Sequence, residues 1–182
     1  MHPSDKNTGN NSDTRTMGRG MLVIFWLLAL GLLTWGFGNW EHQQINPNSN
    51  PISSENAQYR EVILDSNRQH HYVANGQING QSVTFLLDTG ATDVVIPAKL
   101  ANELGLKRGR AATAYTANGS VRVYATELDN LQLGSIRLRN VRASINPGMD
   151  GDGVLLGMSA LRSIDFQQRN GQLILRQDTR MQ

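Results

Sequence analysis

The chain has 182 residues, a length that allows one ordinary domain with appended segments but not two large domains. It contains no cysteine, which excludes disulfides, thiol catalysis and cysteine-based metal sites. The formal net charge is +2, and the short basic stretch at residues 107–110 does not form an extended stripe interleaved with aromatic side chains. The composition therefore argues against a nucleic-acid-binding protein.

The N-terminal 40 residues divide into a polar part and an apolar part. Residues 1–20 have almost no apolar content and are expected to be a disordered cytoplasmic tail. Residues 21–40 read MLVIFWLLALGLLTWGFGNW and carry no charge. As a helix this segment would reach about 30 Å, the thickness of the hydrocarbon core of a bilayer. The pattern predicts a transmembrane helix.

The charges around this segment predict its orientation. Three basic residues precede it, namely Lys6, Arg15 and Arg19. The positive-inside rule then places the N-terminus in the cytoplasm and the rest of the chain outside it, which predicts a single-pass protein of the inner (cytoplasmic) membrane with a periplasmic domain. The alternative is a cleaved signal peptide, for which Gly36 and Gly38 offer a weak small-x-small cleavage pattern.

The remaining chain divides into a stalk and a folded domain. Residues 41–58 are rich in Asn, Ser and Gln and contain two prolines, a composition typical of a flexible stalk. Residues 59–182 consist of short β-branched or leucine-rich runs separated by Asn-Gly, Gly and Pro, which predicts a mainly β domain. Strands are expected at residues 59–64, 71–78, 83–87, 94–96, 114–116, 121–125, 128–133, 136–138 and 141–145, short helices at 98–104 and 159–163, and tight turns at 79–80 and 170–171.

Asp88 is the candidate catalytic residue. It follows the apolar strand at residues 83–87 and opens an Asp-Thr-Gly sequence, so a carboxylate stands where a buried strand ends. By itself this tripeptide is equally typical of a turn or a helix cap. Its context is more specific, because the Asn-Gly hairpin signal at residues 118–119 and the Leu-Leu-Gly sequence at 155–157 follow in order.

The ordered set FLLDTGA, YTANGSV and VLLGMSAL resembles the retropepsin-like aspartic proteases, and over residues 59–176 it is most similar to their bacterial membrane-anchored branch. The resemblance implies a mainly β, retropepsin-like closed barrel, which is the single lobe of an acid protease, with one or two short helices after the transmembrane helix. Retropepsins carry one Asp-Thr-Gly per chain, whereas pepsin-like enzymes carry two in a much longer chain. One copy therefore implies a homodimer.

The same resemblance implies roles for the active-site loop. A water between two Asp88 carboxylates would be activated by a pair that shares one proton. Thr89 would bond across the dimer axis, and the Gly90 amide would donate a hydrogen bond to the carboxylate. Ala91 stands where pepsin-like enzymes usually have a hydroxyl residue, which predicts a milder pH optimum than that of pepsin. No metal and no organic cofactor is expected.

Two further segments would support the site. The expected flap, a hairpin that closes over an extended peptide, contains Tyr115, Thr116, Ala117, Asn118 and Gly119. An ordinary surface hairpin is the alternative interpretation. Leu155, Leu156 and Gly157 are expected to be structural, because the apolar pair would pack beneath the catalytic loop and the glycine would permit close approach.

Other polar clusters are weaker candidates. Asp150 and Asp152 lack the spacing and the terminal glutamate of an EF-hand, and His70 and His71 would point to opposite faces of a strand. The sequence thus predicts a membrane-anchored aspartic endopeptidase that acts on peptides or proteins outside the cytoplasm. The alternatives are a catalytically silent module for dimerisation or peptide binding, and a structural partner in an envelope assembly.

Overall fold

The computed structural model describes residues 12–116 and 119–179. The chain forms two compact units, Met1–Glu41 and His42–Gln182. Helix α1 (Ser12–Ile45) supplies the first unit and continues a few residues beyond it. Within α1, Gly20–Gly38 has a mean hydropathy of 2.1 and no buried residue, and it is the one helix in the described part that is long and apolar enough to cross a membrane. Membrane anchors and signal sequences share these properties.

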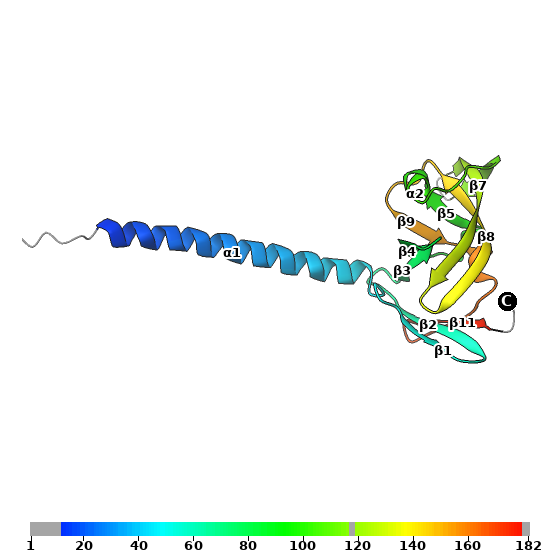
Figure 1. The fold of residues 1–182 in the computed structure, drawn as a ribbon, viewed down its shortest axis with the longest axis horizontal. Coiled ribbons are helices and arrows are strands. Elements are labelled where there is room, and N and C mark those ends of the chain that lie inside the picture. The colour runs from blue at the N-terminus through cyan, green and yellow to red at the C-terminus, as the bar shows by residue number, and fades with distance from the viewer. Residues whose placement is uncertain (1–11, 117–118, 180–182) are drawn as a thin grey trace, which may run out of the picture. The chain divides into compact units, whose positions relative to one another are not determined.

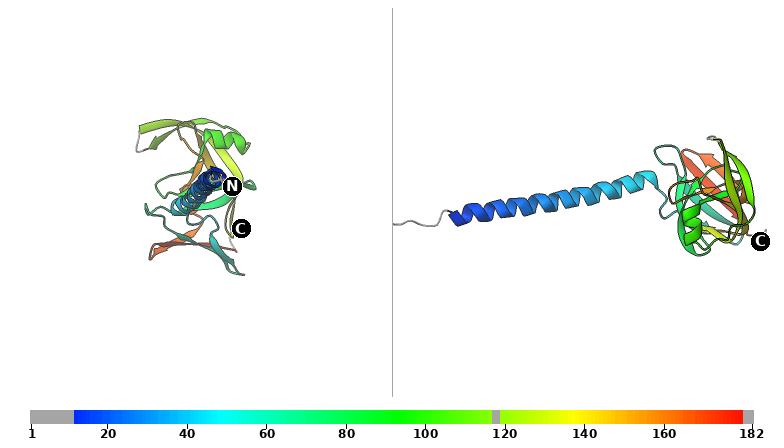
Figure 2. Two further views of the ribbon diagram at one scale, coloured as in Figure 1. Left: turned by 90° about the vertical axis from the view of Figure 1, so that its left-hand side faces the viewer. Right: turned by 90° about the horizontal axis from the view of Figure 1, so that it is seen from above.

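The second unit is mainly β, as predicted (Figures 1 and 2). Its strands are β1 (Ile52–Glu55), β2 (Tyr59–Asp65), β3 (Val73–Ile78), β4 (Gln81–Leu87), β5 (Val94–Pro97), β6 (Ala111–Thr116), β7 (Gly119–Leu133), β8 (Ile136–Asn146), β9 (Gly153–Leu156), β10 (Asp165–Arg169) and β11 (Gln172–Asp178). Two short helices, α2 (Ala98–Glu103) and α3 (Met158–Leu161), follow β5 and β9.

The larger sheet closes on itself. Its strand order is β3-β4-β9-β5-β8-β7-β6, and an additional pairing of β3 with β7 joins the two sides into a barrel. Gly76 lies at this closure, where a Cβ would be only 2.4 Å from the carbonyl oxygen of Gln132. A larger residue there would hold the strands apart, so the glycine permits the closure. The predicted closed barrel is confirmed.

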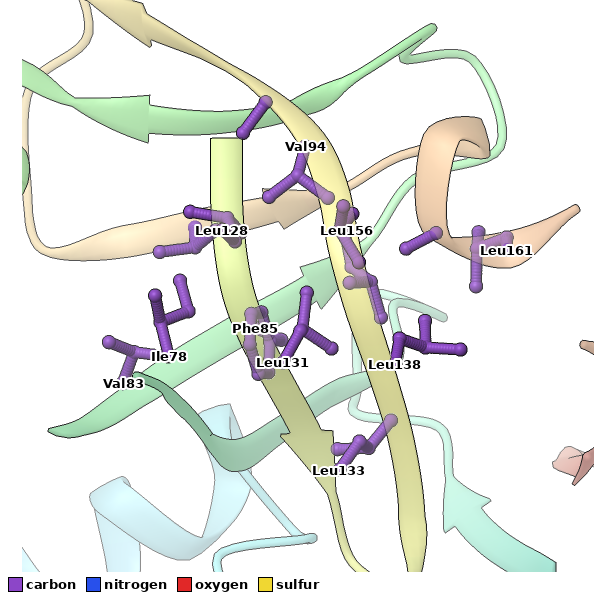
Figure 3. Close-up of a cluster of buried hydrophobic side chains, with 14 of the residues drawn as sticks. Ile78, Val83, Phe85, Val94, Leu128, Leu131, Leu133, Leu138, Leu156 and Leu161 are labelled. Carbon is purple, nitrogen blue, oxygen red and sulfur yellow. The ribbon is translucent and has the colours of Figure 1, made fainter. Parts of the chain in front are cut away.

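Apolar side chains from the barrel strands meet inside it. Figure 3 shows Phe85 of β4 beside Ile78 of β3 and Leu131 of β7, all at most 1% exposed. Burial of side chains of this size, at about 25 cal/mol per Å² of apolar surface, is the main favourable contribution to folding. The core therefore holds β4 in place, and β4 ends at Leu87, directly before Asp88.

A second sheet pairs the first strands of the folded unit with its last strands. Its order is β1-β2-β11-β10, antiparallel throughout. The tight turns predicted at residues 79–80 and 170–171 are present, since both Asn and Gly have positive φ at each of them. Such turns match the twist of the strands they connect.

Several boundaries differ from the expectation. Residues 128–133 are not a separate strand but the end of β7, and 136–138 and 141–145 belong to one strand, β8. The pairing is continuous because Glu127, between the first two predicted pieces, pairs with Arg142, and Arg139, between the last two, pairs with Asn130. Pro97 is the last residue of β5 and directly precedes α2, and Gly105 follows α2 with φ +68, as a C-terminal cap requires.

The segment expected to be a flexible stalk, residues 41–58, contains ordered structure. It includes the end of α1 and strand β1, which pairs with β2. Asn48 is only 4% exposed, and its side chain donates to the carbonyls of Asp65 and Val73 at 2.9 and 2.8 Å and accepts from the Asp65 amide at 2.7 Å. The folded unit therefore begins before Tyr59, because polar side chains of this segment replace missing apolar contacts with hydrogen bonds.

Candidate active site

Asp88 stands at the end of two neighbouring parallel strands. β4 and β9 run parallel, and Leu87 is the partner of Leu156 in their last register pair. The Asp88 amide then donates to the carbonyl of Leu156 at 3.1 Å. The catalytic candidate is thus attached directly to the Leu-Leu-Gly segment, although the two lie far apart in the sequence.

The loop after β4 orients the carboxylate. The Gly90 amide donates to Oδ1 of Asp88 at 2.8 Å, which is the hydrogen bond that the resemblance implied. The Ala91 amide closes the turn by donating to the Asp88 carbonyl at 3.2 Å. Asp88 is half-buried, whereas Thr89 and Gly90 are exposed. The carboxylate is therefore held in one direction and stays open to solvent.

The segment that follows β9 supports the loop that follows Asp88. The amides of Met158 and Ser159 donate to the carbonyls of Ala91 and Thr92 at 2.8 and 2.9 Å. Gly157 lies so near this loop that a Cβ would be 2.1 Å from the carbonyl oxygen of Asp93. Leu156 is buried and Leu155 half-buried. Gly157 thus lies directly against the loop that follows Asp88, and the structural role expected for Leu155, Leu156 and Gly157 stays a prediction.

Two contacts beside the loop were not predicted from the sequence. The buried Ser159 hydroxyl accepts from the Val94 amide at 2.9 Å and donates to the carbonyl of Arg142 at 2.7 Å. The Arg142 side chain forms an ion pair with Asp93 at 2.7 Å. The serine in the otherwise apolar sequence MSAL could have predicted the first contact, because a buried hydroxyl usually has hydrogen-bond partners. The arginine is remote in sequence and gave no signal.

The expected flap lies on the hairpin of β6 and β7. Thr116 is paired with Gly119, and its hydroxyl donates to the Gly119 carbonyl at 2.8 Å. Tyr115 is 89% exposed, so its ring is free for contact with another molecule. Ala117 and Asn118, the centre of the predicted turn, lie outside the described residues. That this hairpin covers Asp88 remains a prediction.

The weaker candidates lie at the surface of the folded unit. His70 and His71 are both exposed, and Asp152 lies 3.8 Å from the amine of Lys99. Within residues 12–116 and 119–179, no group of three or more His, Asp or Glu side chains is close enough to hold a metal ion. The chemistry that the described site offers is therefore that of an oriented, accessible carboxylate.

Comparison with known proteins agrees with this description. Residues 74–163 match the family model described as "gag-polyprotein putative aspartyl protease". A crystal structure of a retropepsin-like aspartic protease from Rickettsia conorii is similar with a TM-score of 0.57 and 27% identity, over 71% of this chain and 96% of that one. The protease of EIAV in complex with the inhibitor HBY-793 is 24% identical with a TM-score of 0.41, over 50% of this chain and 84% of that one.

Two curated relatives are uncharacterized proteins. One from a Sinorhizobium species is 29% identical over 145 residues, which are 78% of this chain and 62% of the relative. One from Rickettsia prowazekii is 29% identical over 104 residues, which are 56% of this chain and 44% of the relative. The chain thus spans less than two thirds of the length of either relative.

The closed barrel and the Asp-Thr-Gly loop at the end of β4 define the single-lobe class of acid-protease folds. The match of residues 74–163 includes Asp88, the expected flap and the Leu-Leu-Gly segment. The chain belongs to the retropepsin-like aspartyl protease family.

Proposed function

We propose that the protein is an aspartic endopeptidase whose active site contains Asp88 from each of two copies. The observation that carries this proposal is the placement of Asp88, which is fixed by the Gly90 amide at 2.8 Å and remains partly exposed. Each copy of the chain has one such carboxylate, because the neighbouring Asp93 forms an ion pair with Arg142. A second copy facing the exposed Thr89 and Gly90 would supply the second carboxyl group that acid-base chemistry needs.

The reaction follows from two carboxyl groups that share one proton. The ionised Asp88 takes a proton from a water held between the pair, and the water oxygen bonds to the scissile carbonyl carbon. The partner subunit's Asp88 gives its proton to the carbonyl oxygen, which forms a tetrahedral diol. A proton then passes to the amide nitrogen, the C–N bond breaks, and the remaining hydroxyl proton returns to the carboxyl pair.

The substrate in this proposal is an extended peptide. The hairpin at Tyr115, Thr116 and Gly119 would cover it and offer backbone hydrogen bonds, as an added strand does. Thr89 would join the two active-site loops across the axis, which its exposure permits. Ala91 provides no hydroxyl beside Asp88, so we expect a pH optimum that is milder than that of pepsin.

We also propose that α1 anchors the enzyme in the inner membrane, with the catalytic domain in the periplasm. The length and hydropathy of Gly20–Gly38 support an anchor. The excess of basic residues before this span supports a cytoplasmic N-terminus. A reporter enzyme that is active only outside the cytoplasm, fused after Gln182, should be active and remain with the membrane fraction. Activity in the soluble fraction would instead indicate signal cleavage.

Cleavage of an unstructured peptide library by the full chain in detergent tests the catalytic proposal. The wild type should cleave at several pH values, Asp88→Asn should be inactive, and Asp165→Asn should act as the wild type does. Asp165 is a suitable control because it is an exposed aspartate on β10. A verified wild-type dimer that binds peptides without cleaving them would favour the catalytically silent binding module.

A further inference from the structure

A basic groove lies where β2, the turn between β3 and β4, and the β7–β8 hairpin meet. Its volume is about 430 Å³. Arg60, Arg137 and Arg139 line it, and no Asp or Glu is among its lining residues. Its other polar lining residues include the amides Gln77, Asn130 and Gln132. Three arginines from two different sheets therefore line one groove, whose other lining residues include amides but no carboxylate.

Arg60 has unused hydrogen-bonding capacity. Its side chain is only 12% exposed, and its Nε donates to Oε1 of Glu55 at 2.8 Å. Its Nη1 is buried and has no hydrogen-bond partner among the described residues. Burying a charged donor without a hydrogen-bond partner costs free energy. Such a group therefore often has a function, such as binding a ligand. An anion in the groove would be attracted by this guanidinium.

The frame of the groove is built by buried side chains. Gln177 is 6% exposed, accepts from the Arg137 amide at 3.1 Å and donates to the Arg137 carbonyl at 2.6 Å. The Ser135 hydroxyl in the β7–β8 turn lies 3.1 Å from the Glu61 carbonyl oxygen of β2 and 2.9 Å from the Ser54 carbonyl oxygen of β1. The start of β8 is thus fixed against the second sheet before any ligand binds, which lowers the entropic cost of binding.

The charge of the groove indicates the class of ligand. The lining includes three arginines and no carboxylate, and Glu55, which pairs with Arg60, lies outside it, so the lining favours an anion. A phosphate monoester carries about −1.5 to −2 at pH 7, and its oxygens match the fork of an arginine. We propose that this groove binds a dianionic phosphate group, either of a lipid headgroup or of a free phosphate compound.

The groove is separate from the proposed catalytic site. β4 begins at Gln81, next to the Gly80 that lines the groove, and ends at Leu87, next to Asp88. Seven residues of strand separate the two, or roughly 20 Å at about 3.3 Å per residue. Binding in the groove can therefore be tested independently of catalysis.

The test is titration calorimetry of the full chain in a nonionic detergent with inorganic phosphate at constant ionic strength. Arg139→Gln should weaken phosphate binding about tenfold, the effect expected for one charge-assisted hydrogen bond. Arg169→Gln is the matched control, because Arg169 is an exposed arginine on β10 outside the groove. It should bind phosphate as the wild type does, and so should Asp88→Asn.

Soluble short-chain lipids identify the source of the phosphate. Dihexanoyl phosphatidic acid that binds more tightly than inorganic phosphate, and loses affinity in Arg139→Gln, assigns the groove to a lipid headgroup. Equal affinity of the two assigns it to a free phosphate compound, and dihexanoyl phosphatidylcholine should not bind in either case. No saturable phosphate binding by the wild type, or equal weakening in Arg139→Gln and Arg169→Gln, would overturn the proposal.

Discussion

The backbone of Asp93 lies so close to Gly157 that a Cβ on the glycine would be 2.1 Å from the Asp93 carbonyl oxygen. The same Cβ would be 2.7 Å from the carbonyl oxygen of Ala91. Both obstacles are backbone atoms, which cannot rotate away as the end of a side chain can. Gly157 therefore determines how closely the segment after β9 supports the loop that carries Asp88.

Gly157→Ala should lower the free energy of unfolding by about 2–3 kcal/mol, because the methyl group would force the two segments apart. Urea unfolding measures this change. The matched control is Gly153→Ala at the start of β9, the strand that Gly157 directly follows, since a Cβ on Gly153 meets nothing within 4 Å. If both variants lose the same stability, close backbone approach is not the reason for glycine at position 157.

Ser159→Ala should lower the free energy of unfolding by about 1–3 kcal/mol, because the Val94 amide would lose its acceptor inside the protein. Urea unfolding again gives the value. Ser163→Ala removes an exposed hydroxyl that donates to the Ala160 carbonyl at 2.8 Å, and it should change stability by less than about 0.5 kcal/mol. Equal effects would show that the hydroxyl of Ser159 is not a structural bridge.

Asn48→Ala should destabilise the folded unit by about 2–3 kcal/mol, because three hydrogen bonds of a buried amide are lost together. The exposed Asn50 provides the control, and Asn50→Ala should be neutral. Limited proteolysis is a second readout. In the wild type, cleavage should be slow at residues 46–55, and Asn48→Ala should accelerate it. Fast cleavage of the wild type there would restore the interpretation of this segment as a flexible stalk.

The ion pair of Glu55 with Arg60 should make the stability of the second sheet depend on pH. The hydrogen bond from Arg60 lowers the pKa of Glu55 below its usual 4.5, with smaller favourable contributions from the charges of Arg60 and Arg137 against desolvation. A lowered pKa means that the stabilisation is present above the unfolded-state pKa and is lost as the pH falls through the folded-state pKa.

The corresponding measurement is the melting temperature of the wild type and of Glu55→Gln between about pH 7 and pH 3. The wild type should melt higher at neutral pH, and the difference should shrink as Glu55 becomes protonated. Asp165→Asn should show no such convergence, because the Asp165 side chain makes no ion pair within the described residues. A difference that does not change with pH would exclude the Glu55–Arg60 ion pair as its cause.

Local sequence patterns were sufficient for most strands and for the position of Asp88. Apolar runs beside Asn79-Gly80 gave β3 and β4, and Asn170-Gly171 gave the turn between β10 and β11, because such turns are short-range features. The division of β8 near Asn140 was wrong for a related reason. Asn140 has φ +51, so it resembles a turn residue, yet Arg139 and Val141 on either side keep their partners on β7.

Long-range polar contacts were not predictable from the sequence. Asn48 stands in a run of Asn, Ser and Pro that is typical of linkers, and its partners at Asp65 and Val73 become neighbours only in the fold. The pair of Arg142 with Asp93 likewise requires the parallel alignment of β5 and β8. The periodicity of apolar residues predicts helices and strands, whereas these polar contacts depend on how the helices and strands are arranged in the fold.

The most direct test of the two-copy active site is to mix wild-type and Asp88→Asn chains at constant total concentration, allow subunits to exchange, and measure peptide cleavage. If each site needs Asp88 from both subunits, activity falls with the square of the wild-type fraction, so an equal mixture retains about a quarter. An equal mixture that retains about half, with a linear decline, would show that one Asp88 is sufficient and would contradict the shared site.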